Sequence, residues 1–284
     1  LGEHVRARRK DHPLMQGVGL AGCGRMGAPM LAALRRGRIP ARGFDVRPPE
    51  DFGALSGAMT DDPDAFATGL KTLITVVRDI TQSEAVLFGR QGFVTRAAEL
   101  ETIVICSTLS PRWVKALQDR VPARIALVDA PMSGAVIGAE EARLTFMLGG
   151  AKADVQRLMP IFRAMGRHIQ HMGGFGAGMT AKVLNNLLAA TNTAMTRIVL
   201  DWADAMGLDE RGLLALIATS SGQNWFASGF EQIEFARHGY DPDNTIAILV
   251  KDVESALDAV PGGAEAAIPN AVREALRNLR PRQK

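Results

Sequence analysis

The stretch Val18-Gly19-Leu20-Ala21-Gly22-Cys23-Gly24-Arg25-Met26-Gly27 decides the fold of this chain. Its first residues form a short apolar run that predicts a strand. After the glycines the sequence predicts a helix, because apolar residues recur at three- and four-residue spacing at Met30, Leu31 and Leu34. A second predicted strand places Asp45 18 residues after the last of these glycines.

The glycines have a strand before them, a helix after them and an acidic residue about 20 positions on, which is typical of a dinucleotide-binding loop. Gly22 would make the tight turn, Gly24 would let the backbone approach a pyrophosphate, and Gly27 would let the helix pack closely on the strand. The N-terminus of that helix would then face the phosphates. We therefore predict NAD as the cofactor, with NADP possible; the alternative is a tight glycine turn in an α/β domain that binds no nucleotide.

Asp45 and Arg47 bear on the choice between NAD and NADP. Asp45 stands where an acidic side chain hydrogen-bonds the ribose 2′-hydroxyl of NAD, and a 2′-phosphate there would meet a like charge. Arg47 could instead fold over a 2′-phosphate, or it could be a solvated loop residue. We predict that Asp45 dominates and that NAD is preferred.

Strands and helices alternate in the first half of the chain, and the second half is helical. Further apolar runs predict strands at 73–77, 103–106, 125–128 and 145–148, with helices at 80–87 and 111–120. This alternation indicates a mostly parallel sheet covered on both faces. The remaining predicted helices lie at 179–206, 208–217, 233–237, 248–257 and 268–279.

The predicted fold is therefore a Rossmann-type, doubly wound α/β domain over residues 15–175, followed by an all-helical domain over residues 176–284. The length of 284 residues suits two domains. The predicted helix at 179–206 is long enough to be a spine or an oligomer interface, so we expect the helical domain to serve substrate binding and self-association as a dimer or tetramer.

The formal charge of +3 is concentrated at the two ends, since residues 1–12 contribute +2 and residues 273–284 contribute +4. The rest of the chain is at −3, which disfavours a nucleic-acid groove because such grooves concentrate basic charge. We expect both ends to be solvated tails. Residues 1–14 show no strand or helix period and are expected to be an extension outside the fold.

Cys23 and Cys106 are too few for a disulfide framework, so we expect free thiols and a cytoplasmic, reducing location. The longest uncharged stretch, 212–230, has a polar centre and is not a membrane span. Neither a metal centre nor a membrane or nucleic-acid partner is predicted.

Lys182, Asn185 and Asn186 form the most informative side-chain group. Residues three and four apart share one face of a helix, so one ammonium and two amides would project together. A lysine whose pKa is shifted by burial can act as general acid or base, and a carboxamide can orient it or the substrate. The alternative is a surface lysine beside two helix-interior asparagines.

Five segments in order, over roughly residues 16–260, resemble the β-hydroxyacid dehydrogenase family, which includes 3-hydroxyisobutyrate dehydrogenase, tartronate semialdehyde reductase and 6-phosphogluconate dehydrogenase. The matching segments are the glycine loop with Arg25 and Met26, Ser107-Thr108-Leu109-Ser110-Pro111, Asp129-Ala130-Pro131-Met132-Ser133-Gly134, Gly176-Ala177-Gly178 with Lys182 and Asn186, and Lys251-Asp252. The resemblance implies an NAD(P)-dependent oxidoreductase of small β-hydroxy acids.

The resemblance also implies roles for single residues. Lys182 would be the general acid/base and Asn186 would position it; Lys251 would approach the cofactor. The substrate residues would be Ser133, Gly134, Ala135, Asn185 and Trp225, and the cofactor would also contact Val77, Arg78, Ser107 and Thr108. From the residues alone, Ser133 could simply close a turn, Thr108 could cap a helix, Lys251 could be solvated, and Trp225 could belong to the core.

This chain departs from the family pattern at several positions. Ala135 replaces a usual glycine, Ala142-Arg143 replace glycine and threonine, Val77-Arg78 replace leucine and proline, and Ile105 replaces a frequent aspartate. These departures leave the substrate open, while Asn185 disfavours a sugar phosphate. Two alternatives remain: an imine reductase of the same fold, which Lys182 disfavours, and a catalytically silent dinucleotide-binding module.

Overall fold

The computed structural model describes residues 16–262 and 264–283, so the predicted extension 1–14 lies outside the described residues. The chain divides into two compact units, one ending at Gly178 and the other made of Thr108–Lys115 and the residues from Met179 onward. The predicted boundary left residues 108–115 with the sheet. They belong to the helical unit because the Leu109 N–H contacts the Met179 sulfur at 3.3 Å and the Ser110 hydroxyl bonds Asp258.

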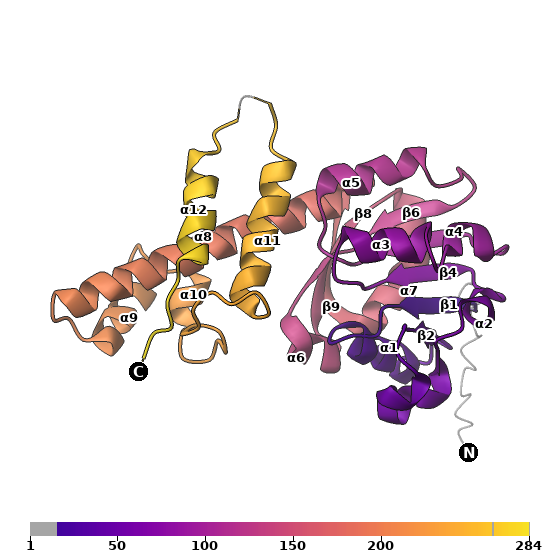
Figure 1. Cartoon of the computed structure of the whole chain (residues 1–284), viewed down its shortest axis with the longest axis horizontal. Coiled ribbons are helices and arrows are strands. Elements are labelled where there is room, and N and C mark those ends of the chain that lie inside the picture. Colours follow the sequence, from indigo (N-terminus) through magenta and orange to yellow (C-terminus); the bar gives the residue numbers. More distant parts are fainter. Residues whose placement is uncertain (1–15, 263, 284) are drawn as a thin grey trace, which may run out of the picture. The chain divides into compact units, whose positions relative to one another are not determined.

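The first unit is built on a nine-stranded, mostly parallel sheet, as the sequence predicts (Figure 1). The strand order is β3-β2-β1-β4-β5-β6-β8-β7, and β9 also pairs with β8. The contacts of β8 with β6 and β7 are antiparallel, and all other pairs are parallel. The strands are β1 (Val18–Ala21), β2 (Arg42–Phe44), β3 (Met59–Thr60), β4 (Thr72–Thr75), β5 (Thr102–Ile105), β6 (Ala126–Asp129), β7 (Met132–Ser133), β8 (Leu144–Gly149) and β9 (Gly166–Gly173).

Side chains of the central strands pack in two apolar layers, one on each face of the sheet, because successive side chains of a strand point to opposite faces. Ile74 and Val104 pack in the cluster that contains α1 (Gly27–Arg36) and α7 (Lys152–Met165). A second group of packed rings joins Phe44, Phe66 and Phe93 at centroid distances of 4.9–5.4 Å. Both faces are thus covered, as a parallel sheet requires.

The remaining helical segments of this unit are shorter. They are the 3₁₀ segment η2 (Pro49–Ala58), α2 (Pro63–Ala67), α3 (Ile80–Leu87), α4 (Phe93–Arg96), the 3₁₀ turn η3 (Leu117–Asp119) and α6 (Ala135–Glu140), while α5 (Pro111–Ala116) begins in the segment that groups with the helical unit.

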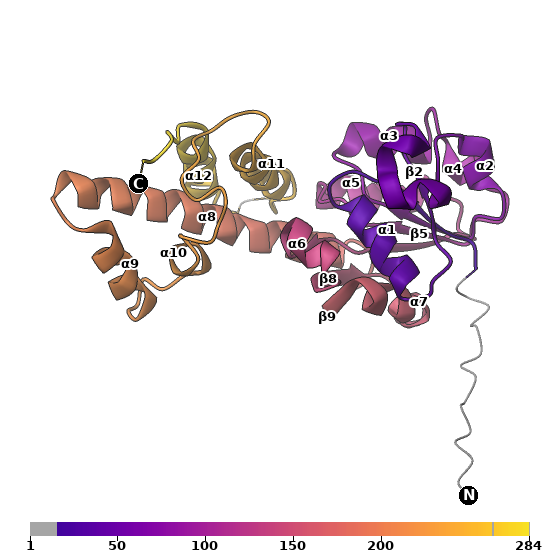
Figure 2. The same ribbon diagram turned by 90° about the horizontal axis from the view of Figure 1, so that it is seen from below.

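The helical unit is organised around α8 (Ala177–Ala205), whose 29 residues match the predicted long helix. Its first half packs against α11 (Thr245–Asp258) and α12 (Ala267–Arg277) through Ala190, Ala194 and their neighbours. Its second half packs through Leu200 against α9 (Glu210–Ala218) and α10 (Trp225–Ser228). The two helix pairs lie on different sides of α8 (Figure 1, Figure 2).

Several elements differ from the prediction. Strands β3 and β7 have two residues each, too short to show a period. Strand β9 was missed because its sequence, GRHIQHMG, is polar and mostly exposed. The predicted helix at 233–237 is a series of turns, and Phe235 and Ala236 pack there against the α9–α10 cluster.

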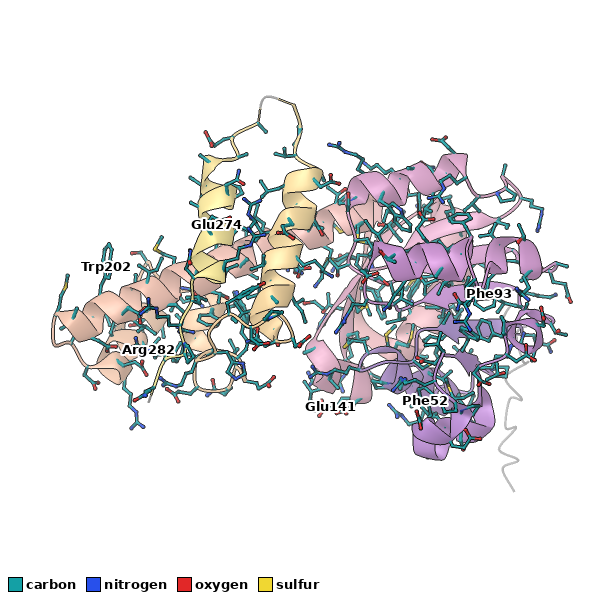
Figure 3. All side chains as sticks on the ribbon, viewed as in Figure 1. Phe52, Phe93, Glu141, Trp202, Glu274 and Arg282 are labelled. Carbon is teal, nitrogen blue, oxygen red and sulfur yellow. The ribbon has the colours of Figure 1, made fainter. Side chains whose placement is uncertain are left out.

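The C-terminal basic segment is not a solvated tail, so that expectation was wrong. The Arg282 side chain is only 6% exposed and lies 2.6 Å from carboxylate oxygens of Asp201, Asp204 and Glu210. The fully buried guanidinium of Arg197 also donates to the carbonyl of Arg280. Figure 3 labels Arg282 beside the C-terminal half of α8. Charge pairing therefore anchors this end together with the apolar packing of Leu276 and Leu279.

No helix among the described residues combines the length and apolar character that crossing a membrane requires.

Candidate functional site

The β1–α1 loop has the conformation that a dinucleotide pyrophosphate needs. Gly22 has φ +93°, and a Cβ there would lie 2.6 Å from the Val76 carbonyl oxygen. A Cβ on Gly27 would lie 1.9 Å from the Gly22 oxygen, so helix and loop approach too closely for any side chain. A Cβ on Gly24 would meet nothing within 4 Å, so the backbone there is open to a ligand.

The N-terminus of α1 is also suited to phosphate. Its first turn holds no acidic residue, and no side chain caps it. Its terminal N–H groups and helix dipole therefore favour an anion. Arg25 and Met26 stand between loop and helix, with Arg25 exposed. The residues present thus fit the predicted NAD-type cofactor.

Asp45 and Arg47 form one ion-paired unit at the end of β2. The Arg47 Nε lies 3.1 Å from Asp45 Oδ1, and the Cys23 N–H donates to Asp45 Oδ2 at 2.8 Å. Arg47 also donates to the Cys23 carbonyl and lies over the Phe52 ring at 4.6 Å. Burial, reinforced by Asp45, raises the pKa of the Cys23 thiol to about 12, so Cys23 is a neutral packing residue. The sequence analysis treated Asp45 as favouring NAD and Arg47 as favouring NADP. In the structure the two side chains form an ion pair with each other.

A second part of the predicted cofactor rim follows β4 and β5. The Val77 N–H donates to the buried Ser107 hydroxyl at 3.0 Å, which ties the two strand ends together. Arg78 is exposed, and its N–H donates to Gln82 Oε1. Thr108 belongs to the helical unit, where its carbonyl accepts from Lys251 Nζ at 3.3 Å. The hydroxyl that accepts N–H bonds at the start of α5 is that of Ser110 rather than Thr108.

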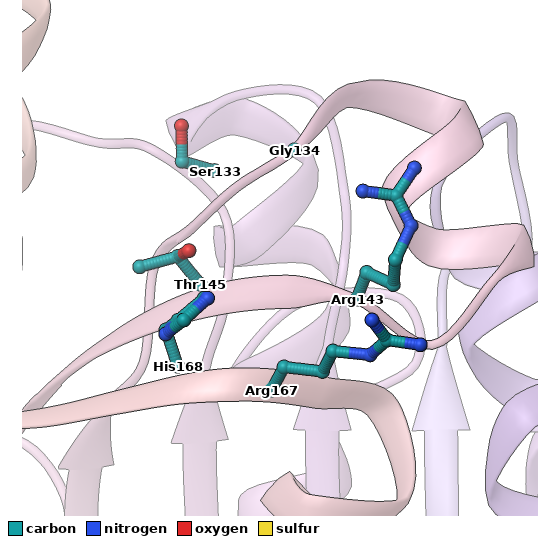
Figure 4. A pocket seen from close by; sticks show the side chains of 6 residues that line it. All are labelled: Ser133, Gly134, Arg143, Thr145, Arg167 and His168. Atoms are coloured by element: carbon teal, nitrogen blue, oxygen red, sulfur yellow. The ribbon is translucent and has the colours of Figure 1, made fainter.

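Ser133, Gly134 and Ala135 form the turn between β7 and α6. Gly134 has φ 134° and Ala135 has φ 53°, so the backbone turns sharply directly after Ser133. Ser133 and Gly134 line a pocket of about 330 Å³ together with Arg143, Thr145, Arg167 and His168 (Figure 4). Ser133 therefore borders a space that a ligand can enter.

Lys182 is a buried lysine of the helical unit. Only 7% of it is exposed, and burial lowers its pKa; the charge of Asp252 opposes that shift, while Lys251 adds to it. Neighbouring Asn186 donates from Nδ2 to Asp252 Oδ2 at 2.7 Å. A lysine whose pKa is lowered by burial can act as a general acid or base.

Asp252 belongs to the Lys251-Asp252 segment of the resemblance but was assigned no role from the sequence, although it completes this group. It is 4% exposed, and burial raises its pKa against the lowering effects of Lys251, Lys182 and Asn186. Within the described residues its Oδ1 has no hydrogen-bond partner, and Lys251 Nζ lies 3.9 Å away. Asp252 and its partner Asn186 are 66 residues apart in the sequence, so no local pattern predicts that they pair.

Asn185 and Trp225 lie at the margins of these groups. Asn185 is exposed and donates to Asn186 Oδ1 at 3.2 Å. Trp225 begins α10, is 42% exposed and makes an edge contact with Phe226. Its ring is therefore neither fully core nor placed by any polar contact among the described residues.

The comparisons with known proteins agree with the fold and the loop. Residues 17–174 match the NAD-binding domain of 6-phosphogluconate dehydrogenase, and residues 176–282 match the NAD-binding domain of NADP-dependent 3-hydroxyisobutyrate dehydrogenase. The chain belongs to the β-hydroxyacid dehydrogenase family and is an NAD(P)-binding oxidoreductase of that family.

Particular relatives share about a third of their residues with this chain. It is 31% identical to 3-hydroxyisobutyrate dehydrogenase of Pseudomonas aeruginosa over 86% of this chain and 85% of that protein. It is 31% identical to 2-hydroxy-3-oxopropionate reductase of Escherichia coli, covering 85% and 83%. It is also 32% identical to the NAD-dependent L-serine dehydrogenase of P. aeruginosa, covering 74% and 72%.

Solved structures show the same fold. A Mycobacterium tuberculosis 3-hydroxyisobutyrate dehydrogenase with L-serine superposes with a TM-score of 0.77 at 25% identity, covering 93% of this chain and 95% of that one. An imine reductase from Myxococcus stipitatus has a TM-score of 0.62 at 14% identity, covering 92% of each chain. Enzymes that catalyse different reactions thus share this fold, so the fold alone does not identify the reaction. The side chains of the site distinguish the possible reactions.

Proposed function

We propose that this protein interconverts a small β-hydroxy acid and its semialdehyde or keto acid. The observation that carries the proposal is the buried Lys182 with Asn186 and Asp252 in a chain whose β1–α1 loop fits a dinucleotide. The bound nicotinamide supplies the hydride chemistry, and the protein supplies binding, orientation and proton transfer.

Lys182 is proposed as the group that takes the hydroxyl proton in oxidation and returns it in reduction. Burial favours its neutral form, which is the form that accepts a proton. Asn186, held by Asp252, orients Lys182 and the substrate oxygen. Ser133 is proposed to hold the substrate carboxylate together with the N–H groups that follow it, as closely spaced donors do for anions.

The substrate class follows from shared chemistry. The relatives are named for 3-hydroxyisobutyrate, 2-hydroxy-3-oxopropionate and L-serine, all of which are short carboxylic acids with a hydroxyl or aldehyde one carbon beyond the α-carbon. An imine substrate is disfavoured by the resemblance, because imine reductases of this fold usually replace the lysine that this chain keeps as Lys182.

A panel of short hydroxy acids, assayed with NAD and NADP by the absorbance of the reduced cofactor, tests this function. We expect turnover of at least one acid with a hydroxyl at the β-carbon. Tight NADH binding without turnover of any hydroxy acid would favour the silent module, and turnover of cyclic imines alone would favour the imine reductase.

We also propose that the chain self-associates through α8. Four exposed apolar residues of this helix and Met206 directly after it, all 55–74% exposed, follow one face: Leu184, Leu188, Met195, Trp202 and Met206. At about 100° per residue they lie within roughly 40° of one another. Trp202 stands off the helix in Figure 3.

A second copy of this chain fits this stripe because the spacing is symmetric about Met195. In an antiparallel pair related by a two-fold axis, Leu188 would face Trp202 of the other copy and Met195 would face itself, as an isologous interface requires. Sedimentation equilibrium should show a dimer or larger assembly that Met195→Glu dissociates and that Leu216→Glu, an exposed apolar change on α9, leaves intact. A monomeric wild-type protein would contradict the proposal.

A further inference from the structure

The pocket beside Ser133 is lined by three adjacent strands. Ser133 of β7 is paired in register with Thr145 of β8, and Thr145 is paired with His168 of β9. Two hydroxyls and an imidazole therefore stand in one row across the sheet. Arg143 directly precedes β8 and lines the same pocket.

The same pocket carries two guanidinium groups. Arg143 and Arg167 both line it, and in Figure 4 both side chains extend to the same side, away from Thr145 and His168. None of the described residues that line the pocket is acidic. Arg143 bonds Glu141 through Nε, and the described part of the chain offers no ion-pair partner to Arg167. Although Glu141 pairs with Arg143 from outside the lining, the lining itself carries two guanidinium groups and no carboxylate, which favours a ligand of negative charge.

The shape and donors of the pocket define the ligand further. Arginine presents a planar fork of donors that matches carboxylate and phosphate oxygens bidentately. A volume of about 330 Å³ accepts a compact group with several oxygens.

We infer that the pocket binds a multiply charged oxyanion group, a phosphate or a second carboxylate, between Arg143 and Arg167. The group can belong to a free anion or to the substrate. In the second case, which rests on the proposed function, Ser133 contacts the substrate and the arginines select hydroxy acids with an additional acidic group.

The first arm of the test needs no enzyme activity. Calorimetric titration with inorganic phosphate should show binding to the wild type that Arg143→Gln and Arg167→Gln each weaken about tenfold or more, since each removes a charge-assisted interaction. Arg163→Gln is the matched control, because it removes the same charge from an exposed arginine of α7 that does not line the pocket. Equal phosphate affinity in the wild type and the double variant Arg143→Gln/Arg167→Gln would overturn the inference, as would an equal loss in the control.

The second arm identifies the source of the anion. It compares kcat/KM for 3-hydroxyisobutyrate and for 2-(hydroxymethyl)succinate, which replaces the methyl group by a carboxymethyl group. If the pocket binds the substrate, the kcat/KM for the diacid divided by that for 3-hydroxyisobutyrate should exceed one. This ratio should fall about tenfold or more in the double variant. Arginine-dependent phosphate binding without such a ratio assigns it to a free anion.

The two proposals fail separately. If phosphate binding depends on the arginines but the protein oxidises no hydroxy acid, the anion pocket is supported and the proposed function is contradicted. If the protein oxidises hydroxy acids but shows neither arginine-dependent phosphate binding nor a preference for the diacid, the proposed function is supported and the anion pocket is contradicted.

Discussion

The Asn186 amide donates to the buried Asp252 carboxylate at 2.7 Å, which joins α8 to α11 beside Lys182. One Asp252 oxygen is thereby fixed, and the other has no hydrogen-bond partner within the described residues. The Asp252 carboxyl group and the amide that bonds to it thus act on the amine proposed to move a proton. Its role is that of a positioning residue.

Asp252→Asn should shift the pH profile to lower pH. The Asp252 charge raises the pKa of Lys182 against the effect of burial, so removing the charge lowers that pKa further. Oxidation needs neutral Lys182, so kcat rises with pH up to the pKa of Lys182, and the midpoint of this rise should move down. The measurement is kcat for alcohol oxidation across pH.

Glu254→Gln is the control for this shift, because Glu254 lies on the same helix and pairs with Arg277. It should leave the midpoint where it is. An unchanged midpoint in Asp252→Asn would show that no Asp252 charge acts on Lys182.

Lys182→Met should reduce turnover by ~10²–10⁴-fold, the usual contribution of a general acid or base. Methionine fills a similar volume without a buried amine, so the thermal midpoint should not fall. The affinity for NADH, measured by fluorescence titration, should barely change, because Lys182 and the glycine loop belong to different units. A variant that keeps more than a tenth of wild-type turnover would exclude Lys182 from proton transfer.

Methyl esters of a good substrate should lose kcat/KM heavily relative to the free acid. The donors proposed to hold the carboxylate at Ser133 would lose a charged partner, and hydrogen bonds to charged groups contribute about 1.5–3 kcal/mol each. Acid and ester are compared in one assay with the same cofactor. Equal efficiency would mean that the carboxylate is not recognised.

The sequence predicts the parts of this protein that depend on local patterns. The loop from Gly22 to Gly27 is found as expected, because backbone atoms leave no room for a Cβ at Gly22 and Gly27, and Gly24 leaves the backbone open to a ligand. The strands β1, β4 and β5 are found because both of their faces are buried and they contain consecutive apolar residues.

Features that depend on distant partners escape such patterns. Strand β9 is held by its pairing with β8 although its own residues are polar, so Arg167 and His168 could not be placed beside Ser133 from the sequence. Asp252 is brought to Asn186 only by helix packing. The basic C-terminal residues look like a tail until the carboxylates that pair with Arg282 are known.

Arg282→Ala should destabilise the helical unit by about 1–3 kcal/mol, because it leaves Glu210 without one of its partners. Burial pushes the pKa of Glu210 up, but bonds from Arg237 and Arg282 outweigh it and leave the pKa lowered. A carboxyl group with a lowered pKa in the folded state stabilises above its unfolded pKa and loses that contribution as pH falls. The difference in urea midpoint between wild type and variant should therefore shrink in acid.

Arg280→Ala is the control for this change, because it removes the same charge but keeps the backbone carbonyl that accepts from Arg197. Its stability should stay near that of the wild type. Equal losses in both variants would mean that net charge, and not the Arg282 contacts, stabilises the C-terminal segment.

The cofactor preference should be for NAD, by on the order of 10²-fold in kcat/KM, because a 2′-phosphate would meet the Asp45 carboxylate. The size of this preference depends on Arg47, since its ion pair with Asp45 neutralises part of the carboxylate charge in the free protein. Arg47→Ala should therefore raise the ratio of NAD to NADP efficiency. Asp45→Asn keeps an oxygen that can accept from the Cys23 N–H but removes the charge, so it should lower the ratio. The two variants move the ratio in opposite directions if Asp45 dominates. A wild-type preference for NADP that Arg47→Ala abolishes would show instead that Arg47 leaves Asp45 and binds the 2′-phosphate.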